Sequence, residues 1–369
     1  MKVAIDTGPL ASGHAVRGIG VHTLELLLAL KELRQKEIEV RGVDFQGEDL
    51  SKYDIVHYQN FHPYFMSIPW KTCLPAGRNR QKLVVTIHDL IPLIYPKHYP
   101  PGVRGKIRFL LQKFLLKNVD SIITISETSK KDICRFLGVV PEKVYVVYLA
   151  PKKTFRKLEI QKRYDLPERF VLYVGDINYN KNIPGLIKAC SIVKIPLVIC
   201  GKQALEVEEL GMGLDILKGP SDYLRFLFNI PHPELSHYKE VTESIKINKD
   251  ILRLGFIPDK DLVAIYNLAT VYCQPSFYEG FGLPVLEAMA CGCPVIAAKT
   301  QALVEIAEGA AVFSDPKDPE DMADKLKKIV SSSSLQSKYK KLGLSHVKKF
   351  SWEKTAKLTL NVYKEVLSR

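Results

Sequence analysis

The chain has 369 residues, 46% of them hydrophobic and 25% charged, an ordinary globular composition that is long enough for two domains with separate cores. Its net charge of +13 favours anionic partners, but it has no zinc finger, aromatic RNA-binding signature or basic low-complexity arm, so nucleic acid is not predicted as a partner. No apolar run reaches the ~20 residues of a transmembrane helix, the first residues MKVAIDTG lack the apolar core of a signal peptide, and the seven cysteines show no disulfide spacing. These features predict a cytoplasmic protein with reduced thiols.

Short β-branched runs alternate with helical patterns along the whole chain. In the first half the predicted strands are residues 3–6, 40–45, 54–58, 83–88, 121–126 and 144–149. In the second half they are residues 170–175, 196–201, 250–255, 270–274, 294–298 and 310–313. Because these strands are almost continuously apolar, we expect parallel sheets that are covered by helices on both faces. The sequence therefore predicts an α/β fold with two doubly wound, Rossmann-like domains.

The charged stretch 151–167 separates the two series of strands, which places the domains at 1–160 and 161–350. Residues 220–248 are longer than a short crossover and indicate an insertion whose purpose the sequence does not reveal. The chain ends in an amphipathic helix, 351–369, for which Ser351 is the expected N-cap.

Residues 97–117 form a basic segment with six lysines or arginines and no acidic residue. Its apolar residues that share one helical face are Ile107, Leu110, Leu111, Phe114 and Leu115. Two interpretations stay open, because periodicity does not separate them. The segment is either a core-packed helix with a solvated basic back, or a helix that lies on an anionic membrane surface and makes the protein peripheral on the inner face of the membrane.

Polar motifs follow several predicted strands, at the sheet edge where doubly wound domains bind ligands. The motif RGIG (17–20) opens a helix, and it is either a tight turn or a ligand loop in which Gly18 and Gly20 would let main-chain N–H groups approach an anion. Thr23 stands at the third glycine position of a dinucleotide fingerprint, which disfavours a NAD-dependent enzyme. His88 closes the strand 83–88, where it either contacts a ligand or is satisfied by local backbone.

The segment VGDINYNKNIPGLIKA (174–189) is a strand, a polar loop and then a helix. Asn182 suits the N-cap, and Pro184 suits the first turn. Lys181 is unfavourable beside the positive end of a helix dipole unless an anion also lies there. This placement favours an anion site over a solvated loop lysine.

The most informative stretch is YEGFGLPVLEAMACGCPVIAA (278–298), in which two glutamates lie among apolar residues. It predicts a loop and a helix that stops at Gly292, so that the N–H groups of Phe281, Gly282 and Leu283 can take a phosphate. Glu279 and Glu287 would face the same site, where carboxylate oxygens accept hydrogen bonds from sugar or ribose hydroxyls. The alternative, a surface Glu279 and a dipole-favoured Glu287, is disfavoured by spacing and position.

One further acidic pair, Asp259 and Asp261, forms a D-x-D that could suggest a metal–diphosphate site. Asp259 follows Pro258 and precedes an apolar helical pattern, so helix capping is the favoured role. We therefore predict no metal and no cofactor other than the substrate itself.

With these motifs assembled, the chain resembles the retaining glycosyltransferases of family 4, the group 1 glycosyltransferases with the GT-B fold. The most specific element is YEGFGLPVLEAMACGCPVIA, which is similar to the E-x7-E signature of that family. Further similarity lies in RGIG, VVTIHDL, SIITISETSKKDI, VGDINYNKN, LGFIPDKDLVAIYNLA and the closing FSWEKTA. The resemblance implies two domains that face a donor cleft, and a last helix that crosses back to the N-terminal domain.

The resemblance also implies roles for individual residues at the nucleotide-diphosphate sugar. Glu279 would bind hydroxyls of the donor sugar, Glu287 would bind the ribose, and Lys181 would counter the diphosphate charge. His88 would contact the donor sugar. The remaining donor-binding residues would be the phosphate donors Phe281, Gly282 and Leu283, the base-pocket residues Phe256 and Ile257, and the phosphate-flanking glycines Gly18 and Gly20.

One departure from the family pattern lies at Asn180, a donor-binding position where the family commonly has arginine. One cationic clamp on the diphosphate would then be missing, and Lys181, Arg17 or another basic side chain would have to suffice. By resemblance, transfer retains stereochemistry, needs no metal, and uses a hexose donor of the GDP-mannose or UDP-glucose type. The hydroxyl acceptor stays open among lipid-linked glycans, polysaccharides and small molecules. The alternative is an inactive nucleotide-binding or membrane-associated module of the same fold.

Overall fold

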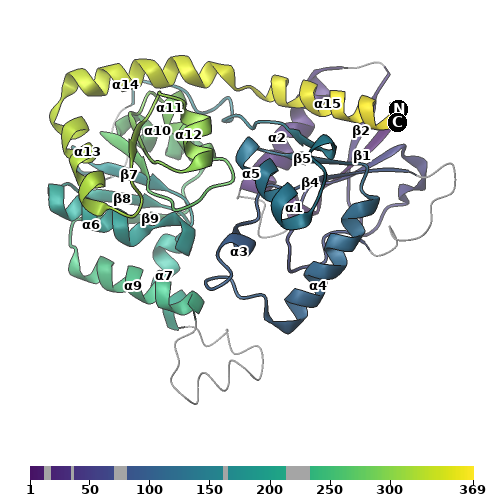
Figure 1. Ribbon diagram of the computed structural model, residues 1–369. Helices are drawn as coiled ribbons and strands as arrows, with labels where there is room; N and C mark the ends of the chain where they lie inside the picture. Colours follow the sequence, from purple (N-terminus) through teal and green to yellow (C-terminus); the bar gives the residue numbers. More distant parts are fainter. Residues whose placement is uncertain (12–17, 35–36, 70–80, 161–164, 213–232) are drawn as a thin grey trace. The chain divides into compact units, whose positions relative to one another are not determined.

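The computed structural model, shown in Figure 1, describes residues 1–11, 18–34, 37–69, 81–160, 165–212 and 233–369. Arg17 and the 220–232 part of the predicted insertion lie outside these ranges. The described chain divides into two compact units. The first comprises residues 1–96, 101–152 and 350–369, and the second comprises residues 97–100 and 153–349.

The first unit is built on a six-stranded parallel sheet with the order β2-β1-β3-β4-β5-β6. Its strands are β1 (Lys2–Asp6), β2 (Glu39–Val43), β3 (Ile55–Tyr58), β4 (Lys82–Thr86), β5 (Ser121–Thr124) and β6 (Val144–Val146). Its helices are α1 (Gly8–Ala11), α2 (Gly18–Glu32), α3 (Ile91–Ile94), α4 (Gly102–Leu115), α5 (Glu127–Asp132) and α15 (Trp352–Ser368). The strand order reverses between β1 and β3, which makes the carboxyl ends of these strands the switch point where such sheets bind ligands.

The second unit repeats this architecture with the order β12-β11-β10-β7-β8-β9, again parallel throughout. Its strands are β7 (Val171–Val174), β8 (Leu197–Cys200), β9 (Ile251–Gly255), β10 (Val271–Gln274), β11 (Val295–Ala298) and β12 (Val312–Ser314). Its helices are α6 (Ile183–Val193), α7 (Gln203–Met212), α9 (Pro233–Ile247), α10 (Asp259–Leu268), α11 (Leu283–Ala290), α12 (Gln301–Ala307), α13 (Pro319–Ser331) and α14 (Ser333–His346). The switch point of this sheet lies between β7 and β10.

Each unit has its own apolar core. In the second unit, side chains of α6, α7, α9 and α13 pack on one face of β7, β8 and β10. In the first unit, the core gathers around β3, β4 and β5, with Leu115 of α4 among its buried members. All twelve strands predicted from the sequence are confirmed, and inner strands such as β3, β5 and β10 are buried along their whole length, as their continuous apolar character predicts.

The last helix, α15, belongs to the first unit, although its sequence follows the second (Figure 1). The predicted cap is confirmed, since the Ser351 hydroxyl accepts a hydrogen bond from the Lys354 main-chain N–H at 3.2 Å. Along the helix, the Thr355 hydroxyl donates to the Tyr148 carbonyl at 2.7 Å, and the Tyr363 hydroxyl lies 2.6 Å from Nδ1 of His57 on β3. These buried polar contacts fix the register of α15 on the first sheet.

Two sequence predictions are wrong in detail. The core-packed interpretation of the basic helix fails, because of its five predicted face residues only Leu115 is buried. Asp259 does not cap α10: Pro258 has the extended N-cap conformation, and Asp259 is the first helical residue. Its charge, together with that of Asp261 in the same turn, still lies at the end of the helix that favours carboxylates.

The described residues contain no helix that is both long and apolar enough to cross a membrane.

Candidate functional site

The loops that follow β7 and β10 meet at the switch point of the second sheet. The main-chain N–H of Phe277 donates to the Asn180 carbonyl at 2.8 Å, and the Asn180 amide nitrogen donates to the Tyr278 carbonyl at 3.0 Å. The Tyr99 hydroxyl donates to the Asn180 amide oxygen at 2.9 Å. Asn180 is therefore buried and ties the two loops together, and its predicted contact with a donor stays a prediction.

Lys181 and Glu279, predicted separately from the two loops, are in direct contact. The Lys181 ammonium donates to both carboxylate oxygens of Glu279, at 2.8 and 2.9 Å. Gln274 Nε2 and the Ser276 hydroxyl donate to the same carboxylate at 2.8 and 2.6 Å. Glu279 is only 7% exposed, so the surface alternative for this glutamate is wrong. The Glu279 carboxylate therefore balances the positive charge of Lys181, which is unfavourable beside the N-terminal end of a helix dipole.

Asn182, the residue after Lys181, links its loop to two other segments of the second unit. It occupies the N-cap position of α6, as predicted, but its side chain makes no capping hydrogen bond. Instead its amide nitrogen donates to the carbonyls of Pro275 and Pro316, at 3.0 and 2.7 Å. Its backbone is left-handed, with φ of 54°, a conformation that asparagine tolerates better than most residues. The capping prediction fails because a tie between loops competes for the same amide.

Glu287 lies in α11 and is also buried, with 8% of its surface exposed. The Tyr266 hydroxyl donates to its Oε2 at 3.1 Å. Burial raises the pKa of Tyr266 well above its usual value, and the charge of Glu287 raises it further. The two predicted glutamates are therefore buried carboxylates of one unit, each held by a hydroxyl donor from its own surroundings.

The start of α11 requires a glycine at position 282. Gly282 has φ of 105°, and a Cβ there would lie 2.6 Å from Cδ2 of Leu303. Leu283 begins the helix directly afterwards, and Phe281 is buried just before it. The first N–H groups of a helix have no intrahelical acceptor, so this end of α11 carries the donor groups that suit an anion.

The predicted base-pocket residues lie further along the same sheet edge. Phe256 and Ile257 follow β9, which is separated from β7 by β8. The Phe256 ring is largely exposed, and Ile257 is half-buried. Both lie beyond the carboxyl end of a strand, as predicted, although not at the switch point itself.

The first unit brings His88 against a residue that the sequence reasoning missed. His22 Nδ1, on α2, lies 2.9 Å from His88 Nε2, and both rings are buried. His22 follows Gly18, the exposed first residue of α2, and the buried Gly20. The sequence feature that indicates His22 as a site residue is its position two residues after the RGIG motif.

A second missed histidine, His57 on β3, lies near this pair. Its Nε2 lies 2.8 Å from the Thr86 hydroxyl. Burial lowers the pKa of His57 to about 3 and lowers that of His22 well below its usual value. These imidazoles are therefore neutral at pH 7 and act as hydrogen-bonding groups, not as cations.

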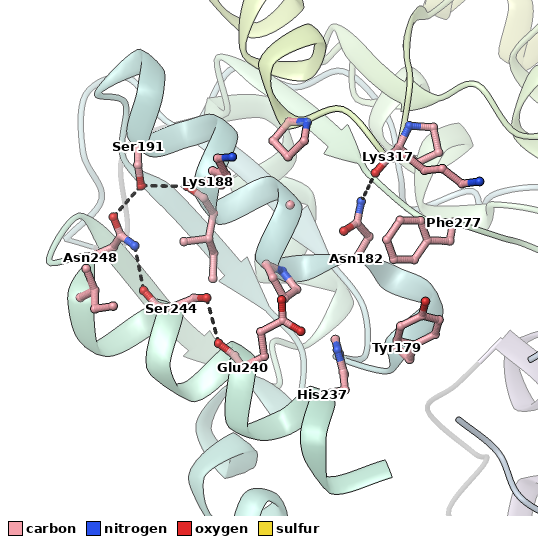
Figure 2. A pocket seen from close by; sticks show the side chains of 16 residues that line it. Tyr179, Asn182, Lys188, Ser191, His237, Glu240, Ser244, Asn248, Phe277 and Lys317 are labelled. Atoms are coloured by element: carbon pink, nitrogen blue, oxygen red, sulfur yellow. Dashed lines mark hydrogen bonds between the residues drawn. The ribbon is translucent and has the colours of Figure 1, made fainter. Parts of the chain in front are cut away.

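A groove of about 710 Å³ lies in the second unit between α6 and α9 (Figure 2), and Tyr179, Asn182 and Phe277 of the two loops are among the residues that line it. Ser191, Asn248 and Ser244 form a chain of hydrogen bonds along it, with Ser191 donating to Asn248 at 2.5 Å and Asn248 donating to the Ser244 carbonyl at 2.8 Å. Lys181, Glu279 and Glu287 do not line this groove. The groove therefore adjoins the two loops, while the Lys181–Glu279 pair itself lies outside its lining.

Within the described part of the chain, no three histidine, cysteine or acidic side chains lie together in a way that could hold a metal ion.

Comparison with known proteins connects these features to a family. The sequence profile described as "Glycosyl transferases group 1" matches residues 155–345, and that described as "Glycosyltransferase Family 4" matches residues 40–150. The first match includes the Lys181–Glu279 pair, Glu287 and the start of α11.

Curated relatives include two proteins of Escherichia coli. O-antigen chain mannosyltransferase B is 28% identical over 301 residues, which cover 77% of this chain and 70% of that protein. Serotype-specific mannosyltransferase WbdA is 25% identical over 331 residues, which cover 85% of this chain but 37% of WbdA. The chain thus spans little more than a third of the length of WbdA.

Solved structures show the same fold. A sucrose-phosphate synthase from Thermosynechococcus elongatus superposes with a TM-score of 0.71 at 20% identity, over 100% of this chain and 99% of that one. Anabaena HepE, crystallised with UDP and glucose, superposes with a TM-score of 0.68 at 14% identity, over 99% and 100% of the two chains. These neighbours are GT-B glycosyltransferases, which confirms the predicted fold class. With a matching profile over more than half of its length, this chain belongs to the group 1 glycosyl transferases.

Proposed function

We propose that this glycosyltransferase moves a hexose from a nucleotide-diphosphate sugar, of the GDP-mannose or UDP-glucose type, to a hydroxyl acceptor. The observation that carries the proposal is the Lys181–Glu279 pair, in the same loop region as the start of α11 and beyond the strands of the switch point. Relatives named as mannosyltransferases support a mannose donor, whereas HepE, whose crystals hold UDP and glucose, supports a glucose donor.

The expected chemistry follows from the charge that develops on the diphosphate. When the bond between sugar and phosphate breaks, the leaving diphosphate gains negative charge and the sugar becomes oxocarbenium-like. Main-chain N–H groups at Gly282 and Leu283 would stabilise the leaving group, and one such donor contributes about 3–4 kcal/mol to a transition state. Lys181 carries three N–H donors and can bridge the Glu279 carboxylate and a phosphate oxygen.

Glu279 would then have two roles. It positions the Lys181 ammonium through the contacts at 2.8 and 2.9 Å, and its oxygens can accept hydrogen bonds from hydroxyls of the donor sugar. Glu287 would accept from the ribose, and His88 would contact the sugar. The reaction would retain stereochemistry by front-face attack of the acceptor hydroxyl, with the leaving phosphate taking its proton and without a metal ion.

The acceptor is proposed as a lipid-linked glycan or a polysaccharide precursor, consistent with the relatives named for O-antigen chains. The alternative of an inactive nucleotide-binding module rests on Asn180, whose side chain offers no cation where the family commonly has one.

A donor panel tests the proposal. Thermal unfolding is measured with GDP-, UDP- and ADP-sugars, because a ligand bound by the native state raises the apparent stability. Release of nucleoside diphosphate is then followed with and without acceptor, and in the presence of a chelator. Stabilisation by one nucleotide sugar and chelator-resistant release would support the proposal. Binding without any release would favour the inactive module, and loss of release with chelator would contradict the metal-free mechanism.

A further inference from the structure

The helix α4 exposes most of its apolar side chains, whereas its uncharged polar side chain, Gln112, is buried. Val103, Ile107, Leu110 and Phe114 are 76%, 62%, 67% and 55% exposed, and their spacing of three or four residues places them on one face. Leu111, at the edge of this face, is 36% exposed. This set of five residues is called the apolar stripe below. A helix of a water-facing surface normally has the opposite arrangement.

The opposite face of α4 holds the helix on the first unit through polar contacts. Gln112 is fully buried, and its Nε2 donates to the His62 carbonyl at 2.7 Å, while its Oε1 accepts from the Ser67 N–H at 2.8 Å. Gly105 is also buried, and a Cβ there would lie 3.1 Å from Cβ of Pro101. The buried glutamine fixes the rotation of the helix, so the outward direction of the apolar stripe is set by specific contacts.

Cations flank the apolar stripe on both sides. At 100° per residue, Arg104 and Arg108 lie along one edge, and Lys106, Lys113 and Lys117 lie along the other. Lys113 donates to the Phe136 carbonyl at 3.0 Å, and the other four side chains belong to exposed residues. Residues 97–117 contain no acid that could neutralise them.

This combination selects one kind of partner. A second copy of the chain would bring two rows of cations together, and like charges repel. Nucleic acid would satisfy the cations but would leave the apolar stripe in contact with phosphates. An anionic lipid surface satisfies both, because headgroup phosphates lie in the plane where the cations end and the acyl chains lie directly beneath.

We propose that α4 is an interfacial helix that docks the first unit on a membrane rich in anionic lipid, with the apolar stripe inserted below the headgroups. The 14-residue helix would lie along the surface and would not span it. The docking is independent of which hexose is transferred.

Vesicle flotation tests this docking with the full chain. We compare phosphatidylcholine vesicles with vesicles that also contain phosphatidylglycerol. The wild type should float with the anionic vesicles and far less with the neutral ones. Substituting Arg104→Gln together with Lys106→Gln should weaken binding by roughly 25-fold, since each cation at an anionic surface contributes about fivefold.

Substituting Leu110→Ser together with Phe114→Ser should weaken binding on the order of 100-fold, because both side chains would otherwise be buried in lipid. The matched control is Lys341→Gln together with Leu342→Ser on α14, which removes one exposed cation and one exposed apolar side chain from the second unit. The control should float like the wild type. All variants should keep the wild-type melting temperature, because the substituted side chains are exposed.

A fluorescence measurement separates insertion from adhesion. In a Phe114→Trp variant, tryptophan emission should shift to shorter wavelength on anionic vesicles, and the Leu110→Ser background should reduce the shift. Flotation that is indifferent to lipid charge, or equal in the serine variant and the control, would overturn the proposal. So would a dimer in solution that Leu110→Ser dissociates, or capture of an acidic protein with no vesicle binding. None of these outcomes depends on turnover, so the docking and the proposed hexosyl transfer can fail separately.

Discussion

The Lys181–Glu279 pair allows stability and transfer to be tested independently. Lys181→Met removes the cation and leaves the Glu279 carboxylate buried, with only the neutral donors Gln274 and Ser276. Glu279→Gln leaves the ammonium facing an amide. Breaking a buried ion pair from one side costs about 3–5 kcal/mol. The side chains of Lys181 and Glu279 are 21% and 8% exposed, so water reaches the ammonium in part. We therefore expect a loss near 3 kcal/mol for either single variant.

The double variant gives the decisive comparison. Removing both charges leaves no uncompensated ion, so Lys181→Met with Glu279→Gln should be more stable than either single variant, and within about 1 kcal/mol of the wild type. Transfer should not recover, since the double variant still lacks the cation for the diphosphate. A missing electrostatic donor lowers turnover by about 10²- to 10³-fold.

Urea unfolding and release of nucleoside diphosphate measure the two quantities. The control is Lys325→Met, which breaks an ion pair at 2.8 Å between Lys325 and Asp321 on α13, with both side chains about 30% exposed. That variant should lose no more than about 0.5 kcal/mol and no activity. A double variant no more stable than the singles would refute the coupling. Wild-type turnover in Lys181→Met would refute the site.

Three further predictions concern other parts of the two units. Gly282→Ala should lower the free energy of unfolding in urea by about 1–3 kcal/mol and abolish the thermal shift with nucleotide sugar, because a φ of 105° is strained for any residue with a side chain. An unchanged thermal shift would contradict the role of this helix end. The free energy of unfolding should fall as pH drops below 6.5, because imidazoles of the unfolded chain take up protons there whereas buried His57 does not until about pH 3. By about pH 4.5 His57 alone should have lowered the free energy of unfolding by roughly 2–3 kcal/mol, so His57→Gln should flatten the pH profile measured by urea titrations. His22→Phe keeps a ring but removes the contact at 2.9 Å with His88, so kcat should fall about tenfold with little change in KM for the donor. An unchanged kcat would show that His22 only packs against its neighbours.

The fold was predictable because its signals are local. Strands such as Val171–Val174 and Val295–Ala298 are short, β-branched and bounded by glycine or polar turns, so their identity does not depend on distant residues. The order of strands within each sheet was not predicted. The strand order depends on the face of the sheet on which each crossover helix packs, and hydrophobic periodicity does not determine that face.

The site was predictable where it follows strand ends. Lys181 and Glu279 were assigned from loops far apart in sequence, and parallel strands bring their carboxyl ends to one edge. Asn182 was misjudged because the Pro275 and Pro316 carbonyls, which compete for its amide, come from other loops. His22 was missed because a histidine on an apolar helix most often indicates core packing.

The basic helix shows a different limit. Its apolar periodicity was recognised, but the same spacing fits a stripe that faces inward or outward. The orientation depends on Gln112, whose polar side chain is buried by carbonyl and N–H groups from the 62–67 segment. Tertiary contacts decide that the glutamine of this helix is buried and its phenylalanine exposed, and the sequence pattern does not reveal those contacts.

The placement of α15 in the first unit has a consequence for synthesis. The chain leaves the first unit after residue 152 and returns to it only at residue 350. On the ribosome, His57 and its neighbours on β3 must therefore wait for Tyr363 until the whole second unit has been translated. During that interval the face of the first unit that α15 covers is open to chaperones and to premature association. A carboxyl-terminal truncation should thus impair the folding of the amino-terminal unit, while the unit next to the cut in sequence is affected less.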